Sequence, residues 1–113
     1  MKHVPLSKSR KNKVTKNCIA IEYPSGDKDI WGAVIKLSGR YPEKGSAVNL
    51  KVKELVYFIE GKGKLVVNGK EIRVKKGDQL VINPGEKFYW VGKLVMFMPC
   101  APAWYPNQHR EVK

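Results

Sequence analysis

Glu54 is the residue of this chain best suited to proton-transfer chemistry. It opens the run ELVYFIE, whose alternation in a strand would place Glu54, Val56 and Phe58 on one face. If that face is the interior one, the carboxyl group must be hydrogen-bonded, paired with a cation or a tyrosine, or held neutral by a raised pKa. A carboxyl group with a raised pKa in an apolar cleft can act as a general acid or base.

A second group of candidates lies in two proline-containing segments. Tyr41 stands in RYPEKG, and the C-terminal CAPAWYPNQH carries Trp104, Tyr105, Asn107, Gln108 and His109. Aromatic and amide groups on a stiff segment can hold a ligand, and they can equally bury the open edge of a β-structure. Both interpretations stay open for these residues.

Other chemical motifs are incomplete. Cys18 and Cys100 lie far apart and outside any CxxC arrangement, so free thiols in a reducing compartment and a disulfide both stay open. The GKGK at 61–64 lacks the full phosphate-loop pattern and precedes a strand, so we interpret it as a hairpin turn. The histidines are His3 and His109, and neither belongs to a recognisable nucleophile–base pair.

Most of the chain consists of short β-prone runs separated by turn residues. The runs expected to form strands are Asn17–Tyr23, Ile30–Leu37, Ala47–Val52, Leu55–Ile59, Lys64–Val67, Glu71–Val74, Gln79–Ile82, Phe88–Val91 and Leu94–Met98. Asn68-Gly69 predicts a two-residue hairpin turn. Pro99 to Pro106 is expected to be an extended tail. Serial hairpins without a helical period predict an all-β antiparallel sandwich or barrel.

The order of these residues resembles the cupins. The segment from Glu54 to Gly69 is similar to the second half of the family's first motif, and Gly77 to Gly85 is similar to the start of its second. The resemblance extends over residues 31 to 109. It implies a cupin double-stranded β-helix, which is an antiparallel jelly-roll barrel.

The resemblance does not extend to the residues with which cupins commonly bind metal. Metal-binding members supply two histidines and a glutamate from the first motif and one histidine from the second. The glutamate corresponds to Glu54, whereas the histidine positions fall within residues 47–50 and on Phe88, and none of these is a histidine. One carboxylate is a poor site for a transition metal. We therefore expect no metal in the usual place and no cofactor.

If Glu54 points inward like its family counterpart, Phe88 and Trp90 share the interior with it. They either fill the space that a metal would occupy or line a ligand cavity with Glu54 as its polar anchor. The residues that we predict to bind a ligand are Glu54, Phe88, Trp90, Asn49, Tyr41, Trp104 and His109.

The functional expectation is a metal-independent cupin barrel that binds a small polar or anionic ligand. A first alternative is a metal-independent sugar isomerase or epimerase that uses Glu54, although such cupins generally use a histidine base. A second alternative is binding of nucleic acid or another anion through the basic N-terminus. Whether the protein is an enzyme stays open.

The net charge of +12 divides evenly between two parts of the chain. Residues 1–16 carry six Lys or Arg and no acid, whereas residues 17–113 carry sixteen Lys or Arg against ten Asp or Glu. We expect residues 1–16 to be a flexible basic arm and residues 17–113 to be one barrel domain. The arm is either a solvated tail or a nucleic-acid contact, and no nucleic-acid-binding motif accompanies it.

The expected partners and location follow from apolar patterning. No run approaches the ~20 apolar residues that span a membrane, and the N-terminus lacks the apolar core of a signal peptide. We expect a cytoplasmic protein without a membrane partner. Leu55, Tyr57 and Ile59 alternate on the outer face of their strand, which predicts a homodimer interface.

Overall fold

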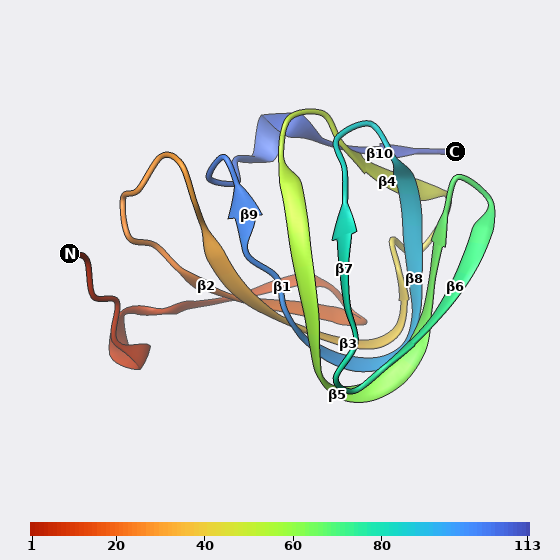
Figure 1. Cartoon of the computed structure of the whole chain (residues 1–113), viewed down its shortest axis with the longest axis horizontal. Coiled ribbons are helices and arrows are strands. Elements are labelled where there is room, and N and C mark those ends of the chain that lie inside the picture. The colour runs from red at the N-terminus through yellow and green to blue at the C-terminus, as the bar shows by residue number, and fades with distance from the viewer.

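Ten strands form one strongly curved sheet (Figure 1). The computed structural model describes residues 1–113. Its elements are η1 (Leu6–Lys8), β1 (Arg10–Thr15), β2 (Cys18–Tyr23), β3 (Gly32–Tyr41), β4 (Ser46–Asn49), β5 (Lys53–Val67), β6 (Lys70–Lys75), β7 (Gln79–Ile82), β8 (Lys87–Phe97), β9 (Cys100–Ala101), η2 (Pro106–Gln108) and β10 (His109–Val112). Every strand pair is antiparallel. The expected all-β antiparallel jelly-roll barrel is confirmed. No helix has the length and apolar character that crossing a membrane requires.

The strand order explains how the ends of the chain reach the interior. The sheet runs β1-β2-β3-β8-β4-β10, and β5 joins it by pairing with β8. β5 also pairs with β6, β7 and β9. The curvature of the sheet brings β1 and β10, at the two ends of this path, to the wall of one cavity.

Two strands are longer than the sequence pattern predicts because glycine lets them bend instead of turn. The GKGK segment at 61–64 lies inside β5, so its interpretation as a hairpin turn was wrong. Gly92 likewise lies inside β8 and is the register partner of Gly63. A Cβ atom on Gly92 would lie only 2.6 Å from the Cα atom of Gly63. Glycine at both positions allows the two strands to approach this closely.

The turn predicted at Asn68-Gly69 is confirmed. Val67 pairs with Lys70 across it, and Asn68 and Gly69 have φ angles of 49° and 83°. Positive φ at both central residues defines the type I′ turn, which asparagine and glycine adopt most readily. This hairpin joins β5 to β6.

Residues 10–15 form strand β1, where we expected part of a flexible arm. Arg10 pairs with Glu22 of β2, and Asn12 pairs with Ala20. No residue of β1 is buried, so the apolar alternation that marks other strands is missing here. Backbone pairing with β2 forms this strand, and the expected boundary at residue 16 therefore does not match the structure.

The C-terminal segment also contains a strand that the sequence pattern does not reveal. After the proline-rich stretch, β10 pairs with β4, with His109 opposite Asn49 and Glu111 opposite Ala47. Its sequence, HREV, has one apolar residue and no buried one. This pairing brings His109 from the end of the chain to the interior of the barrel.

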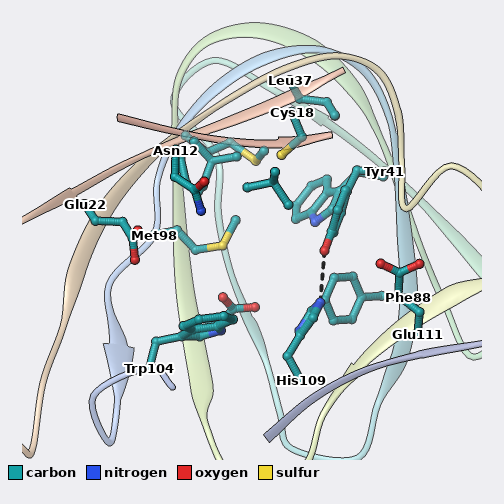
Figure 2. Close-up of a pocket in the computed structure, with 16 residues that line it drawn as sticks. Asn12, Cys18, Glu22, Leu37, Tyr41, Phe88, Met98, Trp104, His109 and Glu111 are labelled. Atoms are coloured by element: carbon teal, nitrogen blue, oxygen red, sulfur yellow. Dashed lines mark hydrogen bonds between the residues drawn. The ribbon is translucent and has the colours of Figure 1, made fainter. Parts of the chain in front are cut away.

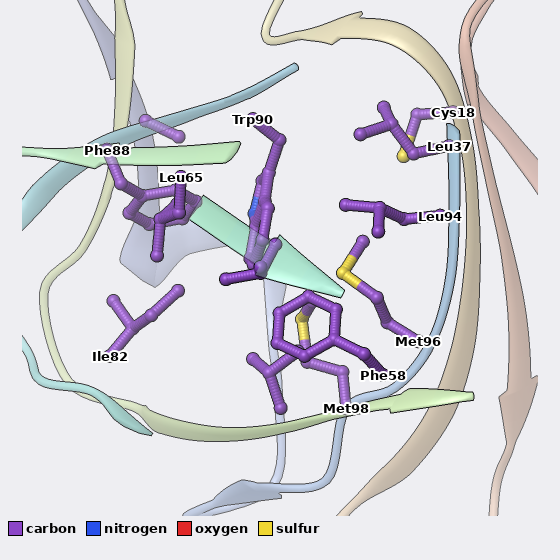
Figure 3. Close-up of a cluster of buried hydrophobic side chains, with 13 residues drawn as sticks. Cys18, Leu37, Phe58, Leu65, Ile82, Phe88, Trp90, Leu94, Met96 and Met98 are labelled. Carbon is purple, nitrogen blue, oxygen red and sulfur yellow. The ribbon is translucent and has the colours of Figure 1, made fainter. Parts of the chain in front are cut away.

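The hydrophobic core fills the barrel beside the cavity (Figure 3). Phe58 and Trp90 meet edge to face with ring centroids 5.7 Å apart, a geometry worth about 1 kcal/mol beyond the area that it buries. The buried cluster comprises Cys18, Leu37, Ala47, Val56, Phe58, Leu65, Val74, Ile82, Phe88, Trp90, Leu94, Met96 and Met98. Phe88 and Trp90 belong both to this core and to the wall of the cavity.

Candidate functional site

A cavity of about 290 Å³ lies inside the barrel (Figure 2). Alternate residues of six strands face it, as the two-residue period of a strand requires. Its wall consists of Asn12 and Val14 of β1; Cys18, Ala20 and Glu22 of β2; Ile35, Leu37 and Tyr41 of β3; Glu54 of β5; Phe88, Trp90 and Met96 of β8; His109 and Glu111 of β10; and Met98 and Trp104. Most of this wall is apolar, with a small number of polar groups converging on it.

Glu54 supplies a buried carboxyl group to the cavity. It lies near the start of β5, held between Ile82 of β7 and Cys100 of β9. Burial raises its pKa from 4.5 to about 7, although a hydrogen bond from Asn49 opposes the shift. Near neutral pH both protonation states are therefore populated, so the group can accept or give a proton at little cost.

Asn49 links Glu54 to the C-terminal strand. Its Nδ2 atom donates to Oε1 of Glu54 over 2.9 Å. Its Oδ1 atom accepts from Nε2 of Gln108 over 3.0 Å and lies 2.8 Å from Nδ1 of His109. The side chain of Asn49 is buried and every hydrogen-bonding atom near it is matched. Asn49 therefore positions the site and is not part of the cavity wall.

Gln108 fixes the orientation of this amide chain. Its Oε1 atom accepts from the backbone N–H groups of Lys51 and Val52, each over 3.3 Å. Because those partners can only donate, the amide nitrogen of Gln108 must face Asn49. The side-chain oxygen of Asn49 then faces Gln108 and its nitrogen faces Glu54. The N–H group that Asn49 donates favours the ionised form of Glu54, which accepts it.

His109 and Tyr41 form a neutral pair in the cavity wall (Figure 2). Since Nδ1 of His109 faces the acceptor oxygen of Asn49, Nδ1 carries the proton and Nε2 has the lone pair. The Tyr41 hydroxyl, 3.0 Å away, donates to Nε2. Burial lowers the pKa of His109 and raises the pKa of Tyr41 above its usual range. The histidine is therefore neutral at neutral pH and the tyrosine keeps its proton.

The residues around Glu54 do not fit the transition metal that cupins commonly bind. Where the family has histidines, this chain places core or amide residues such as Ala47 and Asn49, and Phe88 occupies the last position. Both ring nitrogens of His109 already have hydrogen-bond partners. No three His, Cys, Asp or Glu residues lie together so as to hold a metal ion. The donor set lacks the imidazoles that such a site needs.

The structure brings the predicted ligand-binding residues together. Six of them line the cavity: Glu54, Phe88, Trp90, Tyr41, Trp104 and His109. The seventh, Asn49, lies behind Glu54. In the C-terminal segment, Trp104 and His109 face the cavity, whereas Gln108 is buried and Tyr105 and Asn107 are exposed. That segment thus both closes the barrel and contributes to the wall.

Three polar wall residues were missed from the sequence. Asn12 and Glu111 belong to β1 and β10, two strands that the apolar pattern does not reveal. Glu22 could have been found, because it follows Cys18 and Ala20 in strict alternation within the predicted strand CIAIEY.

The two cysteines are free, buried thiols. Burial raises the pKa of Cys18 to about 11 and the pKa of Cys100 to about 12. Both groups are therefore protonated at neutral pH and are poor nucleophiles. Cys18 contributes to the cavity wall as a small apolar side chain.

Comparison with known proteins finds one family match, over part of the chain, and several structures with the same fold. Residues 49–97 match the cupin domain. No curated protein matches the chain in sequence. Among solved structures, Streptomyces Pac13, described as a nucleoside dehydratase, shares 15% identity and a TM-score of 0.89 over 100% of this chain and 92% of its own. A variant of that protein was solved with uridine.

Two further structures share the fold. The polyketide cyclase RemF from Streptomyces resistomycificus has 21% identity and a TM-score of 0.76, covering 100% of this chain and 86% of RemF. KdgF from Halomonas sp. has 12% identity and a TM-score of 0.71, covering 90% of this chain and 94% of KdgF. At these identities the likeness concerns the fold alone. The family match itself is confined to residues 49–97, and the structural likeness extends the cupin fold over the rest of the chain.

Proposed function

We propose that the protein binds a small molecule in the barrel cavity and that Glu54 transfers protons to and from it. The observation that carries this proposal is a buried carboxyl group, with a pKa of about 7, in the wall of a mostly apolar cavity. An apolar cavity with few convergent polar groups is the common form of a ligand site. The neighbours described as a nucleoside dehydratase and a polyketide cyclase support a role for this barrel in small-molecule chemistry.

The polar groups suit reactions that move a proton without a change of oxidation state. In a dehydration, the Glu54 carboxylate would take a proton from a carbon atom and give it to a leaving hydroxyl group, so that water departs and the carboxylate is regenerated. In an isomerisation or epimerisation, the same carboxyl would return the proton to carbon. Tyr41, whose raised pKa keeps its proton in place, would hydrogen-bond a substrate oxygen.

Hydrogen exchange tests the proposal. The protein is incubated in D₂O with uridine or with neutral aldoses, and NMR follows both the tryptophan resonances and the carbon-bound hydrogens of the probe. We expect binding that shifts Trp90 and Trp104, and exchange that Glu54→Gln slows by about 100-fold or more. Glu60→Gln is the matched control, because Glu60 is exposed on the same strand.

The outcomes separate binding from chemistry. Binding without any exchange would make the protein a carrier and refute the role of Glu54 in proton transfer. Equal exchange in the Glu54 and Glu60 variants would do the same. If neither uridine nor any aldose shifted the tryptophan resonances, the ligand-binding proposal itself would fall.

We also propose a homodimer that forms through the outer face of β5. Leu55, Tyr57 and Ile59 are exposed there. Register pairs Leu55 with Val81 and Tyr57 with Phe97, both exposed, so the apolar surface extends across three neighbouring strands. Soluble monomers rarely expose such a continuous apolar patch. A gel-filtration mass equal to one chain at micromolar concentration would contradict the dimer.

Nucleic-acid binding through the basic N-terminus is a second proposal, and the structure changes its test. Removing residues 1–16 would delete β1 and with it two residues of the cavity wall. Replacing all six Lys and Arg residues of residues 1–16 by glutamine removes the positive charge without deleting the strand. Binding that survives this change, or that is insensitive to salt, would exclude the N-terminus as its cause. A cytoplasmic location is likewise proposed, supported by the two free thiols.

A further inference from the structure

The cavity has a charge opposite to that of the chain. Its titratable wall residues include three carboxyl groups, those of Glu22, Glu54 and Glu111, and no lysine or arginine. The whole chain nevertheless has 22 Lys and Arg and a net charge of +12. Neither Glu22 nor Glu111 takes part in an ion pair, because both ion pairs of the protein involve Glu71. No cation within the wall compensates the negative charge; the nearest cation in register is Arg10 of β1, which lies opposite Glu22 but does not line the cavity.

The three carboxyl groups surround the cavity instead of gathering at one point. They come from β2, β5 and β10, and Figure 2 shows Glu22 and Glu111 on opposite sides of the space. A ligand between them is within reach of negative charge from more than one direction. Glu54 is buried beside apolar side chains that screen its charge poorly, whereas Glu22 is half-buried and Glu111 is exposed, so solvent weakens but does not remove their repulsion of an anion.

The remaining titratable groups do not supply a positive charge. Nδ1 of His109 donates to Asn49 and its Nε2 accepts from Tyr41. A second proton on this ring would point at the hydroxyl hydrogen of Tyr41 and break that bond. Tyr41 and Cys18 are neutral at neutral pH. The cavity wall thus contains neutral hydrogen-bonding groups and carboxyl groups but no cationic group.

We propose that the natural ligand is an uncharged, ring-containing molecule that carries hydroxyl groups, and that the cavity rejects phosphorylated and carboxylated relatives of it. The inference rests on the proposed small-molecule function and narrows the expected polar or anionic ligand to an uncharged one. The ring of such a ligand can pack against Trp90 and Trp104. Its hydroxyl groups can hydrogen-bond to Glu54, to Tyr41 and to Glu22 and Glu111, which we call the outer glutamates. An unphosphorylated nucleoside has this chemistry.

The test uses two pairs of probes that differ in charge: uridine with uridine 5′-monophosphate, and benzyl alcohol with benzoate. Titrations at 150 mM salt follow only the resonances of Trp90, Trp104 and Phe88, so that binding elsewhere on the basic surface does not count. We expect the neutral member of each pair to bind at least about tenfold more tightly. In a Glu22→Gln and Glu111→Gln double variant that ratio should fall to about threefold or less, while Glu60→Gln should keep it.

Three outcomes are decisive. If the monophosphate or benzoate binds the cavity as tightly as its neutral partner, charge selection is refuted while the small-molecule function stands. If the ratio is unchanged in the double variant, the outer glutamates do not cause the selection and this inference is refuted as well. If no probe shifts a cavity resonance, the proposed function itself is refuted.

Discussion

Two concave regions of this barrel carry opposite charge. The cavity inside has three glutamates and no cation. A more open groove of about 650 Å³, which we call the basic groove, is lined by Lys62, Gly63, Lys64, Arg73, Val74, Lys75, Asp78, Val91 and Gly92. In each region, side chains of like charge lie close together, but the repulsion between them is reduced by different means.

Access to solvent determines how each region reduces the repulsion between its charges. In the basic groove, Lys62 faces Lys75, and on its other side it faces Lys93, which lies outside the groove. All three lysines are exposed, so water and salt screen their charges. In the cavity, Glu54 is buried, so the protein must protonate it or hydrogen-bond it, and it does both. The net charge of +12 therefore describes the surface and is no guide to the sign of the charge at the site.

The largest expected effect comes from breaking the amide chain behind the cavity. Asn49→Ala removes one buried hydrogen bond from each of Glu54, His109 and Gln108. We expect the free energy of unfolding to fall by about 3 to 5 kcal/mol, as measured by urea denaturation. The exposed Asn107→Ala is the matched control and should change it by less than about 0.5 kcal/mol. A loss below about 1 kcal/mol in Asn49→Ala would show that water replaces the amide and that the cavity interior is not dry.

A pH series tests whether burial controls Glu54. The folded protein holds this proton more tightly than the unfolded chain, with a pKa of about 7 against 4.5. Stability from this group is therefore fully present below pH 4.5, falls as the pH rises toward 7, and is lost above it. Glu54→Gln should remove this dependence and be more stable than the parent above pH 7 by up to about 3 kcal/mol.

Urea denaturation at several pH values between 4.5 and 8 measures that difference. Glu60→Gln should follow the parent protein throughout, because Glu60 is exposed. A Glu54→Gln protein that is less stable than the parent at every pH would mean that the carboxylate is stabilised by its surroundings. Burial would then not destabilise the charge of Glu54, and the contrast with the solvated lysines of the basic groove would be refuted.

The sequence predicts the parts of this fold that alternation and turn chemistry control. The Asn68-Gly69 turn and the strand Gln79–Ile82 are found where expected, because local residues determine them. The GKGK segment at 61–64 was misjudged because glycine serves equally in a turn and in a close strand crossing. Only the partner strand, with Gly92 beside Gly63, distinguishes the two.

The candidate site is predictable where it rests on apolar strands and unpredictable where it rests on edges. Glu54, Phe88 and Trp90 follow from the family resemblance and from alternation. His109 was a candidate, but its place beside Asn49 depends on β10, whose formation is a matter of backbone pairing with β4. The same holds for Asn12 on β1. Polar edge strands carry no hydrophobic period, so their residues reach the site without a local signal.

The smallest expected effect concerns the basic groove. Cross-strand lysines directly opposite each other repel, and Lys62 has such a neighbour on both sides. Lys62→Gln should therefore raise the free energy of unfolding by about 0.3 kcal/mol in a buffer of low ionic strength. Added salt should abolish the gain, because the Debye length shrinks to about 3 Å at 1 M. Lys70→Gln is the matched control, since Lys70 is also exposed on a strand but faces Val67. Equal, salt-independent changes in both variants would mean that these lysines do not repel one another. The contrast between repulsion that solvent screens in the groove and charge that protonation and hydrogen bonding stabilise in the cavity would then fail.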